Sequence, residues 1–201
     1  MYGDERGIGC RVTLHFGICL VLDLMTLTES QLTRAIYSLW DFQQALSALT
    51  FLLEDCDFDQ EHNKVDLRRF RCYETTLIIS MTRPFEASRS GTTLNLGITG
   101  IRLTPDEGLL VEKVMHLRRK IIAHSDEEEM HYRSIVFPVD DEFNLPHIQF
   151  DEGLHLDEPT FRQIELLLRT LEQALTKFLF RLSQDNPDLL QRDKIPNRLK
   201  N

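Results

Sequence analysis

The stretch that decides the fold runs from Glu158 to Asn186 and reads EPTFRQIELLLRTLEQALTKFLFRLSQDN. Its large apolar residues recur every three or four positions, which is the spacing of one helix face. They are Phe161, Ile164, Leu168, Leu171, Leu175, Phe178 and Leu182. Pro159 is typical of a first helical turn, and the Asn186-Pro187 pair is typical of a helix end. The spacing predicts a long amphipathic helix whose apolar face must be buried against other helices.

Two helices are expected in the first half of the chain. Thr28 and Gln31 have the spacing of a capping box, so a helix should begin there and run to about Glu54. Its expected buried residues are Leu39, Phe42, Leu46, Leu49 and Leu53. A second helix should open near Asp66 and kink or end at Pro84. Its expected buried residues are Phe70, Tyr73, Leu77 and Met81.

A third helix and a change of period follow. Thr104 precedes Pro105, a pair typical of a helix start, and this helix should reach at least His124. Its expected buried residues are Leu110, Val114, Leu117 and Ile121. Within residues 130–156 the apolar residues alternate instead, which is the repeat of a β-strand. We expect a short β-hairpin or an extended excursion there.

These elements predict an all-α domain, a bundle of about four helices with the hairpin or excursion between the third and fourth. The domain should span residues 28–184. Residues 1–27 are expected to be a poorly ordered N-terminal extension, and residues 185–201 a C-terminal tail. The apolar run from Gly17 to Leu22 is far shorter than the roughly 20 residues that cross a bilayer, so no membrane association is expected.

Composition and charge narrow the function classes. The chain has 201 residues and a formal net charge of −9, which disfavours a dedicated DNA-binding protein. Residues 61–120 differ, with 11 Lys and Arg against 7 Asp and Glu. A basic middle of this kind can bind an anion locally, but it is equally compatible with a solvated helix surface. The four cysteines have no paired spacing, which indicates a reducing, cytoplasmic environment.

The segment LRRKIIAHSD, residues 117–126, carries the candidate chemistry. On a continuous α-helix His124 lies on the same side as Leu117, so an imidazole ends an apolar stripe. Arg118 and Arg119 flank that stripe one to two turns earlier. A histidine that titrates near neutral pH and an arginine that stays charged then approach one groove. The alternative is a histidine at the edge of the core, with arginines that solvate the helix.

This segment resembles the signature of the HEPN superfamily, in which an Arg is followed, after four to six residues, by a His on the third helix of a bundle. It is similar to the form Leu-Arg-Asn/Asp-Lys-x-x-Ala-His-Ser-Asp of some abortive-infection and related bacterial proteins. The motif arginine is Arg118 or Arg119, and the flanking residues favour Arg118. Arg119 then stands where the family often has Asn or Asp.

The resemblance implies a metal-independent endoribonuclease without a cofactor, acting as a cytoplasmic defence or toxin component. It also implies a homodimer in which two motifs face each other, and a separate antitoxin or other partner protein. His124 would move a proton, and Arg118 or Arg119 would stabilise the phosphate. Further candidates for contacting RNA are Lys120, Arg68, Arg69 and Arg71.

Two alternatives to a ribonuclease stay open. The four acids of residues 126–129 directly follow the motif and would weaken RNA binding. They favour a non-catalytic HEPN-like module that binds RNA, a nucleotide or a protein partner. The other alternative is a structural helical protein in which the Arg-His spacing is a coincidence. The histidines are spaced too widely to indicate a metal site; they include His124, His131, His147 and His155.

Overall fold

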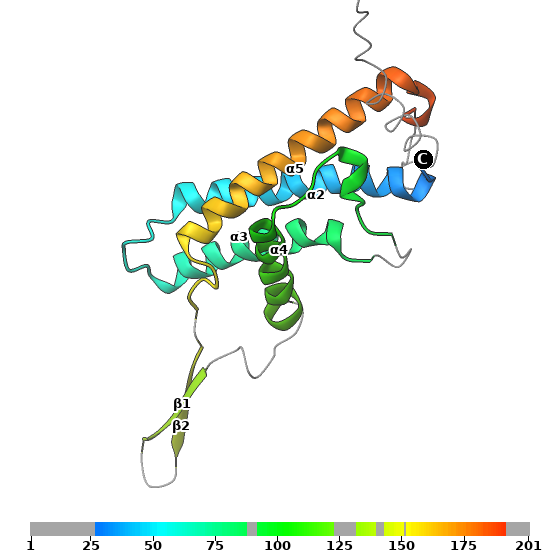
Figure 1. The fold of residues 1–201 in the computed structure, drawn as a ribbon. Helices are drawn as coiled ribbons and strands as arrows, with labels where there is room; N and C mark the ends of the chain where they lie inside the picture. The colour runs from blue at the N-terminus through cyan, green and yellow to red at the C-terminus, as the bar shows by residue number, and fades with distance from the viewer. Residues whose placement is uncertain (1–26, 88–91, 123–131, 140–142, 151, 192–201) are drawn as a thin grey trace, which may run out of the picture.

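The computed structural model describes residues 27–87, 92–122, 132–139, 143–150 and 152–191. Three long helices build a bundle: α2 (Glu29–Asp55), α3 (Lys64–Thr82) and α5 (Glu158–Asp185). The shorter α4 (Pro105–Leu117) runs across them (Figure 1). None of the helices in these ranges combines the length and the hydropathy needed to cross a membrane. The predicted bundle of about four helices is confirmed, while the expected extension at residues 1–26 and residues 192–201 of the expected tail lie outside the described ranges.

Short elements complete the chain between the helices. The 3₁₀ turn η1 (Arg83–Phe85) follows α3, and the 3₁₀ turn η2 (Leu96–Thr99) precedes α4. A third 3₁₀ turn, η4 (Pro187–Leu189), follows α5. Pro84 therefore ends α3, as its missing N–H predicts.

Side-chain caps determine where the helices begin. The capping boxes expected at Thr28 and Thr104 are both present. Asn63 caps α3 by accepting the backbone N–H groups of Val65 and Asp66. This helix therefore begins two residues before the predicted start at Asp66, because Asn is among the strongest N-cap residues.

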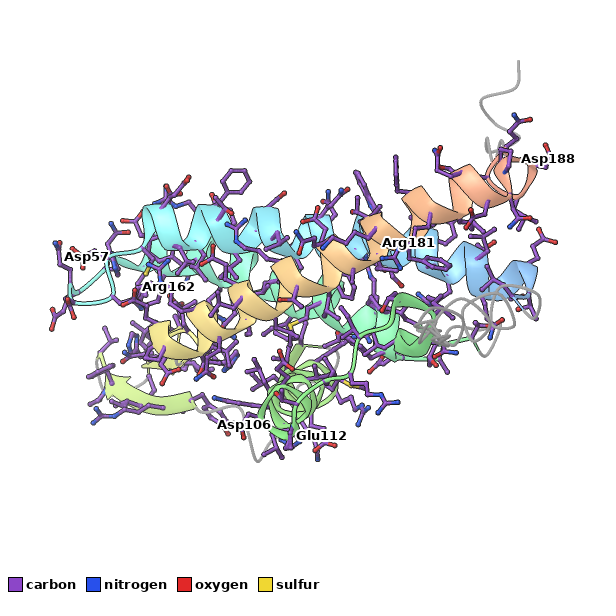
Figure 2. The ribbon with its side chains drawn as sticks, turned by 45° about the horizontal axis from the view of Figure 1, so that its top comes forward. Asp57, Asp106, Glu112, Arg162, Arg181 and Asp188 are labelled. Carbon is purple, nitrogen blue, oxygen red and sulfur yellow. The ribbon has the colours of Figure 1, made fainter. Side chains whose placement is uncertain are left out.

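The core lies between the facing sides of the long helices. All seven residues of the predicted α5 stripe are buried, while Arg162 and Arg181 stand on the outside of that helix (Figure 2). The α2 stripe was only partly predicted. Phe42 and Leu49 are buried and the other three predicted residues are half-buried, while the buried face also includes Leu32, Ala35, Ala45, Ala48 and Leu52. Alanine carries a weak hydrophobic signal in a sequence, yet its small side chain allows close helix packing.

The hairpin inserted before α5 is confirmed. Its strands, β1 (Tyr132–Pro138) and β2 (Asn144–Phe150), are antiparallel and pair from Tyr132 with Phe150 to Pro138 with Asn144. The hairpin projects away from the helices (Figure 1). Its side chains are almost all exposed, so the bundle gives it little cover.

The segment that joins the hairpin to α5 is held against α3. The buried carboxylate of Glu74 accepts the backbone N–H groups of His155 and Leu156, at 2.8 Å and 2.9 Å. One turn earlier on α3, Arg71 donates to the carbonyl oxygen of Gly153 at 2.5 Å. These bonds satisfy backbone groups that α5 and the hairpin leave unpaired.

Burial raises the pKa of Glu74 from its usual 4.5 to about 7, because a charged carboxylate loses its hydration inside the protein. The N–H groups of His155 and Leu156 and the guanidinium of Arg71 act in the opposite direction. Arg71 Nε lies 3.9 Å from Glu74 Oε2. The attachment of this segment therefore contains a group that titrates near neutral pH.

The third helix departs from the prediction. It is α-helical only to Leu117, and the residues Arg118–Ile122 form a π-helix, η3. A π-turn closes between residues i and i+5, so each residue advances by a smaller angle around the axis than in an α-helix. The chain thus remains helical to Ile122 as predicted, but the α-helical spacing assumed up to His124 does not hold beyond Leu117, and His124 itself lies outside the described residues.

A matched pair of leucines on α5 tests the packing. Leu168 is 0% exposed and Leu166 is 69% exposed. We expect Leu168→Ala to lower the free energy of unfolding by about 2–5 kcal/mol, because it removes buried methyl groups and leaves a cavity. Leu166→Ala should change it by less than about 0.5 kcal/mol. Urea denaturation measures both values, and similar losses for the two variants would contradict this packing.

Glu74 should make stability depend on pH. Its pKa is higher in the folded chain than in the unfolded chain, so its contribution is fully present below pH 4.5 and is lost as the pH rises through 7. Glu74→Gln removes this titration. We expect the variant to gain on the order of 2–3 kcal/mol relative to wild type between pH 4.5 and pH 8.

Urea denaturation of both proteins at several pH values measures that difference. Glu54→Gln, a change at an exposed carboxylate near the end of α2, is the control and should show no comparable trend. A Glu74→Gln difference that stayed constant with pH would show that this carboxylate has no raised pKa.

Candidate functional site

The candidate motif lies in the π-helix that extends α4. The backbone N–H of Arg118 donates to the carbonyl oxygens of Val114 and Met115, where α4 ends. Such π-turns are rare in proteins, and those that occur often lie at functional sites. The wider turn changes the directions of Arg118 and Arg119 relative to the apolar face of α4, which contains Val114.

Both motif arginines bind the same carboxylate, that of Glu86, which follows η1. Arg118 Nη1 contacts Glu86 Oε2, and Arg119 Nε lies 3.5 Å from Glu86 Oε1. The side chain of Arg118 is 23% exposed, whereas that of Arg119 is 61% exposed. Arg118 is thus largely enclosed around its partner, and Arg119 is the guanidinium that solvent can reach.

Two further arginines lie in the same region. Arg34 of α2 donates to the carbonyl oxygens of Glu86 and Thr92, at 3.5 Å and 3.0 Å. Arg83 of η1 pairs with the buried Asp41 of α2 at 3.3 Å. We call this group the arginine cluster: Arg34, Arg83, Arg118 and Arg119, with the carboxylates Asp41 and Glu86.

The carboxyl group of Asp41 is affected both by Arg83 and Arg34 and by the motif arginine Arg118. Burial raises the pKa of this carboxyl above its usual value, while Arg83, Arg34 and Arg118 act in the opposite direction. Asp41 is thus close enough to Arg118 to sense its charge. With four guanidinium groups and two carboxylates, the cluster carries a formal charge of +2 although the whole chain is acidic. Such a group can bind an anion through charge-assisted hydrogen bonds.

The sequence analysis named two of the four arginines of this cluster, Arg118 and Arg119. Arg83 precedes a helix-ending proline, a place where a charged side chain lies beside the end of the helix. Arg34 carries no comparable signal, because a charged residue on a long amphipathic helix is ordinary. Both were missed because their proximity to Arg118 depends on how α2, η1 and α4 pack together.

The other expected RNA contacts lie elsewhere. Lys120 is half-buried in η3. Arg68, Arg69 and Arg71 are in the first two turns of α3, and Arg71 is roughly 18 Å along the helix axis from Arg83. The structure therefore does not bring these three arginines to the arginine cluster, which lies beyond the opposite end of α3.

Each of these three arginines has an acidic neighbour. Arg68 pairs with Glu152 at 2.7 Å, and Arg69 pairs with Asp66 at 3.3 Å. Arg71 lies near Glu74 and holds the segment before α5 through the carbonyl oxygen of Gly153. They act as structural contacts in the described conformation.

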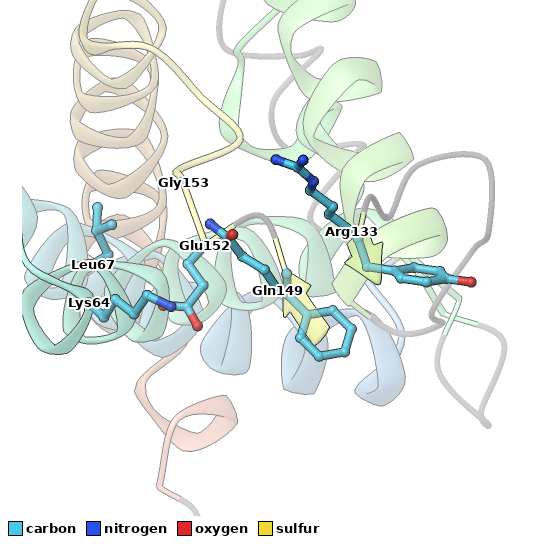
Figure 3. A pocket seen from close by; sticks show the side chains of 8 residues that line it. Lys64, Leu67, Arg133, Gln149, Glu152 and Gly153 are labelled. Atoms are coloured by element: carbon cyan, nitrogen blue, oxygen red, sulfur yellow. The ribbon is translucent and has the colours of Figure 1, made fainter. Parts of the chain in front are cut away.

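A separate open cavity lies between the base of the hairpin and the start of α3 (Figure 3). Its volume is about 630 Å³. It is lined by Lys64, Leu67, Tyr132, Arg133, Gln149, Phe150, Glu152 and Gly153. This mixed lining has no concentration of one charge. Within the described ranges, no group of three or more His, Cys, Asp or Glu residues could hold a metal ion.

A double-mutant cycle tests the Glu86 contact. The variants are Glu86→Ala, Arg118→Ala and the pair. We expect a coupling energy of about 1–2 kcal/mol, because the two side chains are largely shielded from water. The exposed helical pair Glu158 and Arg162, whose contact is 3.2 Å, should give about 0.5 kcal/mol. Urea denaturation provides the energies, and a Glu86–Arg118 coupling no larger than that of the control pair would contradict the enclosed contact.

Comparison with known proteins adds no family to this picture. Protein-family models, curated proteins and solved structures were searched, and none matches the chain. The resemblance to the HEPN signature therefore rests on residues 117–126 alone. The structure shows a helical bundle with an inserted hairpin and an arginine cluster.

Proposed function

We propose that this protein binds the phosphate backbone of RNA at the arginine cluster and cleaves RNA without a metal ion, as a HEPN-type endoribonuclease. One observation carries the proposal. Four guanidinium groups from α2, η1 and η3 gather around two carboxylates, next to the segment that leads to His124. Arginine is the side chain best suited to a phosphodiester, because its planar fork matches two phosphate oxygens and stays charged.

The chemistry needs one proton transfer and one charge-stabilising group. The 2′-oxygen of a ribose attacks the adjacent phosphorus, and the bond from phosphorus to the 5′-oxygen breaks. A 2′,3′-cyclic phosphate and a free 5′-hydroxyl result, with a net transfer of the 2′-hydroxyl proton to the leaving oxygen. His124 would carry that proton, since an imidazole exists in both protonation states near neutral pH. A guanidinium would stabilise the extra charge on the pentavalent phosphorus.

We propose different roles for the two motif arginines, because their exposure and their contacts with Glu86 differ. Arg119 is the more exposed and lies 3.5 Å from Glu86, a longer contact than a strong charged hydrogen bond. A phosphate can replace the carboxylate there at small cost. Arg118 is enclosed with Glu86 and would act as a positioning residue. The proposal therefore gives the phosphate contact to Arg119, with Arg83 as a second exposed guanidinium.

Other parts of the proposal rest on the sequence resemblance. They are a cytoplasmic location, a homodimer that brings two motifs together, a role in defence or as a toxin component, and a separate antitoxin or other partner. None of these four features is argued from a contact among the described residues.

One observation favours a second function, a non-catalytic module that binds RNA, a nucleotide or a protein. Arg118 and Arg119 already share Glu86 as a partner, so an incoming phosphate must compete with a carboxylate held in the chain. A cluster whose positive charge is partly offset in this way suits modest binding without turnover. The two functions predict the same role for Arg119 in binding and differ at His124.

An RNA cleavage assay separates the two functions. The substrate is an end-labelled single-stranded RNA incubated with excess EDTA, and an all-2′-deoxy version of the same strand is the negative control. We expect wild type to cut only the RNA, and His124→Ala to lose on the order of 100-fold or more in rate, because the proton carrier is gone. Circular dichroism checks that the variant stays folded.

Binding is measured in parallel at several salt concentrations. Arg119→Ala should weaken RNA binding and reduce its salt dependence, since one phosphate contact is lost. Arg169→Ala on the outside of α5 is the control for removing an arginine and should leave binding unchanged. RNA binding that depends on Arg119 without cleavage would support the module. Unchanged cleavage by His124→Ala, or the absence of any Arg119-dependent binding, would reject the ribonuclease.

A further inference from the structure

The hairpin leaves a large apolar surface in water. Eight of its large apolar side chains are between 48% and 68% exposed. They are Tyr132, Val136, Phe137, Val139, Phe143, Leu145, Ile148 and Phe150. A lone two-stranded hairpin is marginally stable in water, and soluble monomers rarely expose apolar patches of this size. The hairpin is therefore as rich in apolar side chains as a strand pair that packs against another part of a protein or another molecule.

The two outer edges of the hairpin differ in their hydrogen-bonding capacity. The N–H of Val139 donates to the carbonyl oxygen of Phe143 at 2.9 Å, next to the last pair of the register. Because bonded and non-bonded pairs alternate along an antiparallel ladder, Ser134 and Pro146 are in non-bonded pairs, and their nitrogens point outward. Proline has no N–H, so Pro146 removes a donor from the middle of the outer edge of β2.

The outer edge of β1 keeps its donors. By the same alternation, the outward nitrogens of β1 belong to Tyr132, Ser134, Val136 and Pro138, and the first three carry an N–H. Pro138 ends the run, so these three donors are centred on Ser134. Within the described residues the sheet has two strands, and no third strand pairs with this edge.

We propose that β1 pairs with β1 of a second copy of this chain, to form a four-stranded antiparallel sheet across a two-fold axis at Ser134. Two identical antiparallel strands pair symmetrically about the two-fold axis. Residues equally far from Ser134 on either side therefore lie opposite each other, so Tyr132 of one copy lies opposite Val136 of the other. All three outward N–H groups then face carbonyl oxygens of the second copy. Such isologous contacts are the usual form of a homodimer interface.

The side chains suit this register. Tyr132 and Phe150 are neighbours in one hairpin, with ring centroids 6.3 Å apart, and Val136 of the second copy would extend that apolar row. Pairs of aromatic and β-branched residues stabilise neighbouring strands. Arg133 is the charged residue of β1, and it would face Ile135 of the second copy rather than another arginine. No like charges are therefore placed directly opposite each other.

The hairpin as a whole exposes an apolar area in the range of an interface, and the pairing at the β1 edge covers the part that lies on β1. The eight half-exposed apolar side chains, four of them aromatic, together offer on the order of 800 Å². A standard protein interface buries about 800 Å² on each partner. This inference does not rest on the proposed ribonuclease, because it uses none of the residues of the arginine cluster.

The test measures oligomeric state by sedimentation across a range of micromolar concentrations of the full chain. We expect wild type to be a dimer. Ser134→Pro removes the central outward N–H without removing a bond between β1 and β2, and should raise the dimer dissociation constant by about tenfold or more. Ser134→Thr keeps the N–H, is of similar shape and should remain a dimer.

A cysteine scan tests the register itself. Under mild oxidation Ser134→Cys should form a disulfide with position 134 of the second copy, because the two Cα atoms would lie about 5.5 Å apart. Ile135→Cys is one step from the axis, points to the opposite face and should form little. Peptide mapping identifies the 134–134 link among the native cysteines.

The outcomes distinguish this inference from the proposed function. A monomer at all concentrations, or a dimer that Ser134→Pro does not weaken, would overturn the β1 pairing. A hairpin covered only by a different protein would also appear as a monomer and would overturn it. A β1-dependent dimer without RNA cleavage would support the pairing while the ribonuclease proposal failed.

Discussion

Removal of the apolar face of α5 from water is the constraint on which the other elements depend. This helix spans the length of the bundle and packs antiparallel along α2, so that Phe161 at its start meets Phe58, with ring centroids 5.8 Å apart. Further along, Glu172 accepts a hydrogen bond from Gln43 of α2 at 3.3 Å. The remaining helices close the same core. Helix α2 also packs along α3, and α3 in turn contacts α4, which brings Arg34 and Asp41 of α2 close to Arg83, Glu86 and Arg118.

The arginine cluster shows how one set of residues can serve the fold and a site together. Glu86 links the region beyond α3 to the end of α4, and Arg34 holds the residues on either side of 88–91. These contacts order the cluster before any ligand arrives, which lowers the entropy cost of binding. The same contacts reduce its free positive charge. Affinity for an anion and stability of this end of the bundle therefore draw on the same guanidinium groups, and improving one would weaken the other.

The sequence predicted the elements well because their signals are local. The capping boxes at Thr28 and Thr104, the proline after α3, the α5 stripe and the alternating hairpin all depend on residues within a few positions of each other. Long-range features were not predicted. Arg34 and Arg83 join Arg118 only through packing, and Glu74 reaches the backbone of residues some 80 positions later. A buried glutamate has no signature in a sequence, since most glutamates are exposed.

In the π-helix at Arg118–Ile122 the side chains of the candidate motif point in directions around the helix axis that α-helical spacing does not predict. One π-turn encloses one residue more than an α-turn, so it acts as a single-residue insertion absorbed within a helix. Removing one residue from η3 would restore an α-helix and turn whatever follows by about 100°. Two homologous chains could therefore share the same helices and the same arginines and yet aim them at different surfaces. Spacing between an arginine and a histidine alone is thus an incomplete description of such a motif.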